Sequence, residues 1–213
     1  MMEFVANSGA TKVLDVGVGT GKYGFLCREY LEVYPGKVAS VLREAASVEG
    51  RACGRLVLDG VEGFPGYLTP LHDLIYDHIY IGDALDVISR MDDLAYDLVL
   101  LIEVLEHLTQ DAGFELLRHC KRVGRTALVV TPRAFCGQGS LFGNPLEVHR
   151  SLWTPRELRK GGADLTFVVE DMVIAVLGRP VSCKYATPLR RLRRCLRKSV
   201  GLIWPRASAG RAG

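Results

Sequence analysis

Three glycines at alternating positions, Gly17, Gly19 and Gly21, follow directly on the apolar stretch 12–16, which contains Asp15. The stretch is long enough for one buried parallel strand, and the glycines let the backbone turn sharply and approach a ligand where a Cβ would intrude. Apolar residues then recur at helical spacing, so the turn lies between a strand and a helix start. In an α/β protein, this turn is the usual place of a nucleotide-like cofactor.

The spacing of the glycines separates three classes of cofactor site. A P-loop ends in Gly-Lys-Ser/Thr, whereas Gly21-Lys22 is followed by Tyr23, which excludes this class. Residues 19–24 match the dinucleotide pattern G-x-G-x-x-G, a weak signal that leaves an NAD-dependent oxidoreductase as an alternative. Residues 13–21 match the third pattern, hydrophobic-hydrophobic-Asp-hydrophobic-Gly-x-Gly-x-Gly. On this motif the chain resembles the class I (Rossmann-like) S-adenosylmethionine-dependent methyltransferases.

The resemblance implies a cofactor and a fold. The cofactor is S-adenosyl-L-methionine, contacted by Asp15 and the three glycines. The fold is α/β and Rossmann-like, a doubly wound, mostly parallel seven-stranded sheet with one antiparallel strand near the C-terminal end. The β-like runs 165–170 and 172–177 have almost no linker between them, which predicts the tight antiparallel pair that closes such a sheet.

A second strand, predicted over 55–62, ends in Glu62, whose carboxylate is placed to accept both ribose hydroxyls of the cofactor. Glu62 lies further from the glycines than the usual separation of about 20 residues. We therefore expect an insertion over 36–54 that is mostly helical over 38–48. Glu44 lies nearer to the usual separation, but its neighbours favour a solvated position on a helix.

A third short strand, predicted within 77–85, ends in Gly-Asp-Ala. The resemblance implies that Asp83 accepts the adenine amino group and that the backbone amide of Ala84 meets the adenine ring. Asp83 is also suited to be the N-cap of the helix that follows, and both interpretations stay open.

The clearest strand, 96–102, ends in Glu103-Val104-Leu105-Glu106-His107, at the edge that faces the ligand in open α/β sheets. The resembled family often carries such a segment beside the methionine part of the cofactor and the substrate, so Glu103 is assigned to the cofactor. His107 is either a catalytic group on the substrate side or a helix-start residue bonded to backbone, and Glu106 could be exposed to solvent. Short zinc helix motifs have histidines at both ends, so we expect no metal here.

The segment that follows the predicted strand 126–131 has many turn residues up to position 152, and long loops at a ligand edge are usually functional. Its cations, amide and aromatic residue suit a polar substrate. His149 is the first candidate for a base or substrate ligand. Substrate contacts are predicted from Arg133, Asn144, Arg150 and Trp153. Related small-molecule methyltransferases carry a similar His-x-x-x-Trp-Thr-x-x-Glu-Leu segment, which ends in a helix start with a capping box.

Composition predicts one globular catalytic domain over 1–183 and a basic tail over 184–213. The 213 residues are 48% hydrophobic and 24% charged, no apolar run is long enough for a membrane span, and no signal segment is recognised, so a cytoplasmic location is expected. The six cysteines form no C-x-x-C pair, and neither a disulfide framework nor a zinc site is expected.

The tail holds nine of the 27 Lys and Arg residues and no acidic residue, so the remaining 18 basic residues face all 24 acidic ones. An acidic body argues against nucleic-acid binding. The tail is amphipathic and could bind a membrane surface or an acidic partner, dock on its own domain, or be disordered.

Taken together, these patterns predict methyl transfer to a small polar molecule, first to oxygen, with nitrogen as the next candidate. The alternatives are the oxidoreductase above and a non-catalytic adapter that keeps the cofactor-binding fold.

Overall fold

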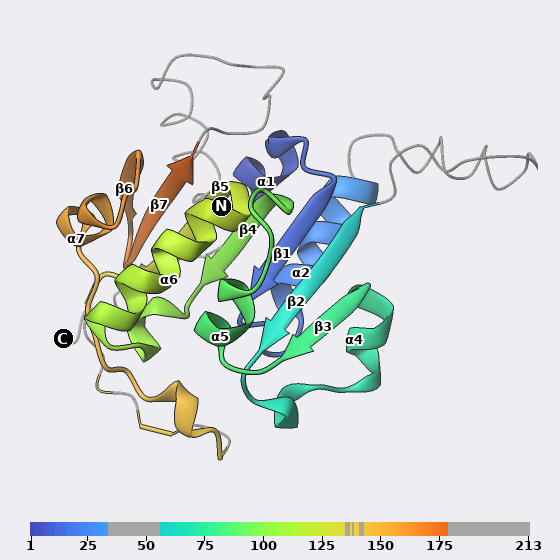
Figure 1. Ribbon diagram of the computed structural model, residues 1–213, viewed down its shortest axis with the longest axis horizontal. Helices are drawn as coiled ribbons and strands as arrows, with labels where there is room; N and C mark the ends of the chain where they lie inside the picture. The colour runs from blue at the N-terminus through green and yellow to red at the C-terminus, as the bar shows by residue number, and fades with distance from the viewer. Residues whose placement is uncertain (34–55, 135–136, 138, 141–142, 179–213) are drawn as a thin grey trace, which may run out of the picture.

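A seven-stranded sheet with the order β3-β2-β1-β4-β5-β7-β6 forms the centre of the protein (Figure 1). The computed structural model describes residues 1–33, 56–134, 137, 139–140 and 143–178. The strands are β1 Lys12–Val16, β2 Val57–Glu62, β3 His78–Ile81, β4 Tyr96–Ile102, β5 Gly124–Pro132, β6 Leu165–Val169 and β7 Met172–Gly178. The helices are α1 Met2–Ser8, α2 Lys22–Arg28, α4 Pro70–Ile75, α5 Ala84–Ser89, α6 Gln110–Val123 and α7 Pro155–Lys160. The shorter helical segments are η1 Glu29–Val33, η2 Pro65–Tyr67, η3 Leu105–His107 and η4 Pro145–Glu147.

Strands β3, β2, β1, β4 and β5 pair in parallel, while β7 pairs antiparallel with both β5 and β6. The prediction of a mostly parallel sheet with one antiparallel strand near the C-terminal end is therefore confirmed. The reason is local, since Glu170 and Asp171 alone connect β6 to β7, and a parallel pair needs a crossover of a dozen or more residues. Glu170 takes the left-handed conformation, with φ 52°, that this tight turn uses.

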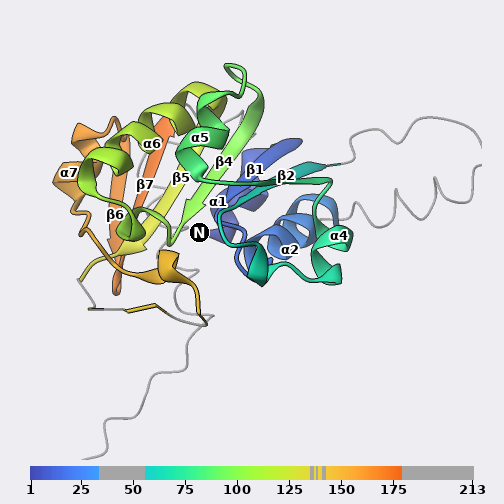
Figure 2. The same cartoon turned by 60° about the horizontal axis from the view of Figure 1, so that its bottom comes forward.

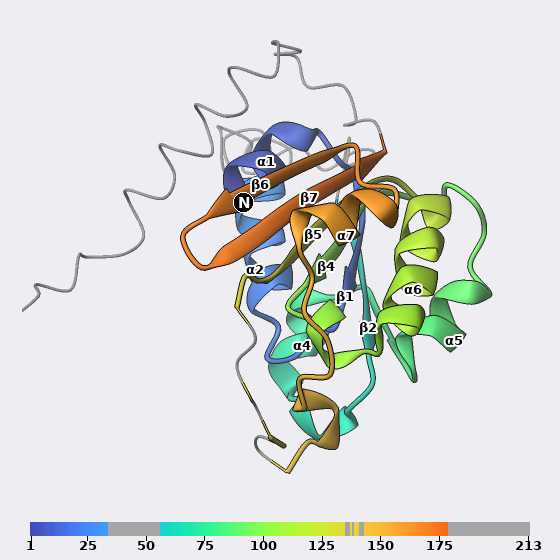
Figure 3. The ribbon, with the colours of Figure 1, turned by 90° about the vertical axis from the view of Figure 1, so that its left-hand side faces the viewer.

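Helices cover both faces of the sheet. Helices α1, α2 and α4 lie on one face and α5 and α6 on the other (Figures 2 and 3). Each helical layer packs on the sheet through its own apolar cluster, one that includes Val5, Cys27 and Ile75 and one that includes Ile88 and Leu116. Strand β4 is nearly all apolar because both of its faces are covered.

The predicted and observed elements differ mainly at their ends. The run 77–85 contains β3 only over its first half, because the chain leaves the sheet at Gly82 and α5 begins at Ala84. The patterns above do not predict the short helices α1 and α4, whose stability depends on packing against the sheet. The helical insertion over 38–48, Glu44 and the tail 184–213 lie outside the described residues. Among the described helices, none has the length and apolar character needed to cross a membrane.

Candidate active site

The carboxyl ends of β1, β2 and β4 lie side by side at one edge of the sheet. Strand β1 is flanked by β2 and β4 in parallel register, with Val16 opposite Val61 on one side and Leu101 on the other. Glu62 ends β2, and Glu103 directly follows β4. Residues predicted from three separate stretches of sequence therefore converge on the edge where ligands bind in open α/β sheets.

The glycine turn after β1 uses conformations that favour glycine. Gly17, Gly19 and Gly21 all have positive φ, at 79°, 53° and 83°. A Cβ at position 17 would lie 2.5 Å from Cγ2 of Val104, so this glycine is required by space as well as by conformation. The Gly17 amide donates to the Val61 carbonyl at 2.9 Å, which ties the turn to β2.

Glu62 holds the turn from the neighbouring strand. Its carboxylate is buried, and it accepts hydrogen bonds from the Gly19 amide at 2.8 Å and from the Phe64 amide at 2.7 Å. The ring Nε2 of His72 lies 3.1 Å from the Gly19 carbonyl oxygen. Both polar groups of the peptide backbone at Gly19 are thus engaged, so the turn is positioned before any ligand arrives. Sequence patterns missed His72 because its role depends on the packing of α4.

Asp15 lies beneath the turn and is 1% exposed. Burial raises its pKa from 3.8 to about 7, opposed by a 2.7 Å hydrogen bond from the Tyr76 hydroxyl and reinforced by the charge of Glu62. Tyr76 is a second residue that sequence patterns missed. A direct contact between Asp15 and a cofactor stays a prediction.

The raised pKa of Asp15 predicts a pH dependence of stability. Below pH 3.8 both states hold the proton; between pH 3.8 and about 7 only the unfolded chain releases it, so the free energy of unfolding falls as pH rises. The whole shift corresponds to at most about 4 kcal/mol. We expect Asp15→Asn to remove this loss of stability. The free energy of unfolding of the variant minus that of the wild type, measured by urea unfolding, should therefore increase from pH 3.8 to about 7. An unchanged difference at all pH values would contradict the assignment.

Glu103 presents its side chain to solvent at the end of β4. Its φ of 56° is unusual for a residue with a Cβ, and such conformations gather at functional sites. The Glu103 amide is held by the Val130 carbonyl at 2.8 Å, and the Tyr23 hydroxyl donates to its carboxylate at 3.4 Å. The predicted contact of Glu103 with the cofactor is not tested by this geometry and stays a prediction.

Asp83 is the N-cap of α5. Its Oδ1 accepts from the amides of Leu85 at 2.8 Å and Asp86 at 3.3 Å, and its carboxylate is exposed. The structure therefore contains the N-cap hydrogen bonds predicted for Asp83. An adenine contact through Asp83 and the Ala84 amide stays a prediction.

Glu106 in η3 is 3% exposed, so the interpretation of this residue as solvent-exposed is wrong. The side chain turns inward, where the Thr131 hydroxyl donates to Oε2 at 3.1 Å. Burial raises the pKa of Glu106 to about 7, and the charges of Glu103 and Glu147 also raise it. The hydrogen bond from Thr131 acts in the opposite direction and lowers it.

His107 and His149, the two predicted catalytic histidines, lie together although 41 residues separate them in sequence. Their ring centroids are 5.0 Å apart at an interplanar angle of 62°. The loop that carries His149 is fastened to η3, because the amides of Arg150 and Ser151 donate to the Glu106 carbonyl at 2.7 and 3.1 Å. Burial lowers the pKa of His107, so this imidazole is neutral near neutral pH.

Comparisons with known proteins found no match among protein-family models or curated protein sequences. Solved structures do match. The PH0226 protein from Pyrococcus horikoshii OT3 has a TM-score of 0.53 at 14% identity, over 78% of this chain and 81% of that one. An O-methyltransferase family protein from Burkholderia thailandensis has a TM-score of 0.52 at 15% identity, over 84% of this chain and 55% of that one.

This chain has the Rossmann-like methyltransferase fold. The structure of PigF with SAH also matches, with a TM-score of 0.51 at 14% identity, over 80% of this chain and 51% of that one. The chain thus spans about half the length of the Burkholderia thailandensis protein and of PigF.

Two of the predicted substrate contacts are structural residues of the methyltransferase fold. Trp153 is completely buried, and its indole N–H donates to the Leu105 carbonyl at 3.1 Å and to the Ser151 hydroxyl at 2.8 Å. Asn144 is 3% exposed, and its side-chain oxygen caps η4 through the Leu146 amide at 2.9 Å. Burial gives both side chains a role in holding the loop, and their contacts with a substrate stay predictions.

The other two predicted substrate residues remain candidates. Arg133 directly follows β5 at the same edge as Glu103, and its side chain is exposed while its amide donates to the Asp171 carbonyl at 2.8 Å. Arg150 is also exposed and follows His149 directly. The structure therefore leaves both guanidinium groups available for a polar substrate at this edge.

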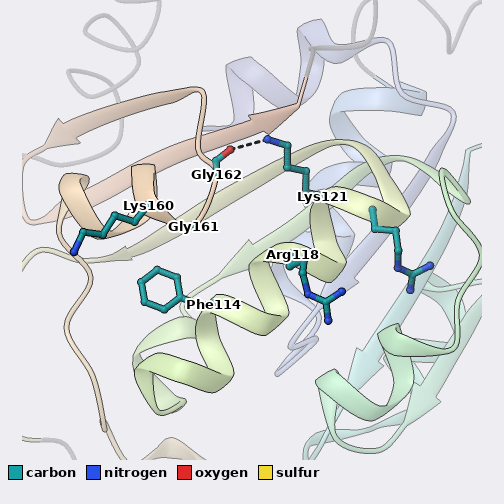
Figure 4. Close-up of a pocket in the computed structure, with 7 residues that line it drawn as sticks. Phe114, Arg118, Lys121, Lys160, Gly161 and Gly162 are labelled. Atoms are coloured by element: carbon teal, nitrogen blue, oxygen red, sulfur yellow. Dashed lines mark hydrogen bonds between the residues drawn. The ribbon is translucent and has the colours of Figure 1, made fainter.

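A surface hollow of about 750 Å³ lies away from this site, between the C-terminal half of α6 and the end of α7 (Figure 4). Its lining is mainly cationic. The Lys121 ammonium donates to the Gly162 carbonyl at 3.1 Å, and Arg122 pairs with Asp93 at 2.6 Å. These cations stabilise the connections around α6, and none of them lies at the carboxyl ends of β1, β2 and β4.

Proposed function

We propose that this protein is an S-adenosylmethionine-dependent methyltransferase that transfers the methyl group to oxygen on a small polar molecule. One observation carries the proposal: the glycine turn after β1 is hydrogen-bonded to Glu62 at the end of β2. Strand β4, which is followed by Glu103, flanks β1 on its other side. The mixed sheet supports the proposal, because β7 runs antiparallel between β5 and β6. A plain dinucleotide-binding fold lacks this strand.

The cofactor-binding groups follow from their places on the sheet edge. The glycine turn offers a close approach of backbone to the ligand, and Glu62 offers a buried carboxylate for the ribose hydroxyls. A carboxylate that accepts from the Gly19 and Phe64 amides still has a free lone pair on each oxygen. Glu103 is assigned to the methionine part, and Asp83 with Ala84 to the adenine.

The chemistry requires the protein chiefly to align two reactants. The sulfonium of the cofactor makes its methyl group electrophilic, so holding the acceptor in line with the carbon–sulfur bond and excluding water supplies much of the rate. A hydroxyl acceptor must also lose its proton. We assign activation of the acceptor to His107 and His149, the histidine pair beside Glu106, and binding of its polar groups to Arg133 and Arg150.

Titration calorimetry with S-adenosylhomocysteine and, separately, with NAD⁺ tests the proposal. We expect saturable binding of S-adenosylhomocysteine and none of NAD⁺, because the turn and Glu62 suit an adenosine that carries an amino-acid group. Binding of NAD⁺ alone would favour the oxidoreductase, and binding of neither would overturn the methyltransferase assignment and favour an adapter. A product assay with radiolabelled cofactor and hydroxyl-bearing small molecules then identifies the acceptor.

A further inference from the structure

Glu106, His107 and His149 come together beside the proposed cofactor site, and each directs one ligand atom to a common place. These ligand atoms all lie within 4.8 Å of one another. We propose that the three side chains form a binding site for one divalent first-row transition-metal ion. Glu103, Glu106 and His107 alone offer one imidazole, whereas the fold supplies a second imidazole, that of His149, from the distant loop.

The backbone holds these residues in place before an ion binds. His107 directly follows Glu106 in η3, and the Arg150 and Ser151 amides fasten the His149 loop to the Glu106 carbonyl at 2.7 and 3.1 Å. The Thr131 hydroxyl donates to the Glu106 carboxylate at 3.1 Å and thereby orients it. Hydrogen-bonded partners of this kind are typical of ligating carboxylates. The cluster is therefore built from fixed elements.

The charges around the cluster favour a cation. Glu106 is 3% exposed, and none of the described Lys or Arg side chains forms an ion pair with it. Its charged neighbours are Glu103 and Glu147, which repel its negative charge. A buried carboxylate is normally paired or coordinates a metal.

One histidine nitrogen gives a second, independent indication. The Nδ1 atom of His107 is buried and has no hydrogen-bond partner among the described residues. Leaving a polar atom buried without a partner is costly, and a neutral imidazole nitrogen is a ready metal ligand. A bound ion would give this imidazole a partner within the cluster that His107 forms with Glu106 and His149.

The ligand types decide the class of ion. Two imidazoles and one carboxylate suit zinc and the other first-row divalent ions, whereas calcium and magnesium prefer oxygen ligands. Three protein ligands leave coordination positions for water or a substrate oxygen. A zinc ion lies about 2.0–2.2 Å from such ligands, so a small inward movement of the three side chains closes the site.

For methyl transfer the inference rests on the proposed function and deepens it. An ion in this place would polarise the hydroxyl of the acceptor and lower its pKa. The hydroxyl proton passes to water, the oxygen forms a bond to the methyl carbon, and the carbon–sulfur bond breaks with its electron pair on sulfur, leaving S-adenosylhomocysteine. His107 and His149 then activate the acceptor as ligands of the ion.

Cobalt(II) titration of the chelator-treated full chain tests the site by visible absorption. We expect ligand-field bands that saturate at one Co²⁺ per chain and disappear when Zn²⁺ is added. His149→Gln, His107→Gln and Glu106→Gln each remove a ligand, and we expect each to weaken Co²⁺ binding by at least about tenfold. His78→Gln removes an exposed histidine on β3 and is the matched control, with unchanged binding.

Circular dichroism and S-adenosylhomocysteine calorimetry on the same samples separate the two proposals. Folded variants that keep S-adenosylhomocysteine affinity and lose Co²⁺ affinity support the metal site. Absence of bands in the wild type, or full bands in any folded ligand variant, overturns this ligand set whatever the cofactor result. If the wild type binds Co²⁺ but does not bind S-adenosylhomocysteine, the proposed function is overturned and the metal site is not.

Discussion

Replacing Glu62 with alanine is expected to weaken S-adenosylhomocysteine binding by about 100-fold. The variant loses the carboxylate proposed for the ribose hydroxyls, and hydrogen bonds to a charged group contribute about 1.5–3 kcal/mol each. It also leaves the Gly19 and Phe64 amides without their acceptors, which loosens the glycine turn. Calorimetry of the wild type and the variant measures the change.

Two further variants make this result specific. Glu62→Gln keeps the size of the side chain and one acceptor oxygen, so its affinity should lie between those of the wild type and Glu62→Ala. Glu115→Ala removes an exposed carboxylate on α6 and should bind as the wild type does. Undiminished affinity in a folded Glu62→Ala variant would show that this carboxylate does not contact the cofactor.

Replacing Trp153 with alanine is expected to lower the free energy of unfolding by about 3–5 kcal/mol. The indole is completely buried, stacks edge to face on Phe114 with ring centroids 5.0 Å apart, and closely approaches Gly113 of α6. The change leaves a large cavity and removes the hydrogen bond to the Leu105 carbonyl. Urea unfolding followed by circular dichroism measures the loss.

A comparison with milder changes tests the structural role of Trp153. Trp153→Phe keeps most of the ring volume and should cost less than Trp153→Ala. Val168→Ala shortens a side chain that is 46% exposed on β6 and should change stability by less than about 0.5 kcal/mol. A stable Trp153→Ala variant with altered kinetics would instead support the predicted substrate contact and contradict the structural role described above.

The residues of the proposed cofactor-binding edge could be predicted from the sequence because each of them lies in a local sequence pattern. The glycines after β1, the buried aspartate and the acids at the ends of β2 and β4 each follow a recognisable apolar run. Parallel strands bring their carboxyl ends to one edge, so the residues that follow β1, β2 and β4 are expected along that edge. That β2 and β4 are the neighbours of β1 is seen in the sheet order. The antiparallel β7 was predictable for a similar reason, since its connection to β6 is too short for a crossover.

Other features depend on contacts between distant segments. His72 and Tyr76 reach the turn only because α4 packs beside it; His72 lies 53 positions after Gly19 in the sequence, and Tyr76 lies 61 positions after Asp15. Composition favoured a substrate role for Trp153, yet whether an aromatic side chain faces solvent or core depends on what packs over it. The same holds for Glu106, whose burial no local pattern indicates.

By itself, the sequence determined where most of the strands lie along the chain, the glycine turn and the acids that mark its ligand edge, because strand pattern and turn chemistry are local properties of the chain. Only the tertiary structure decided which polar residues meet. It brought His149 to Glu106 and His107 through backbone hydrogen bonds, buried Trp153 and Asn144, and fastened Gly19 between Glu62 and His72. These contacts join residues far apart in sequence, and the free energy that holds them comes from packing that forms only when the whole sheet and its two helical layers are assembled.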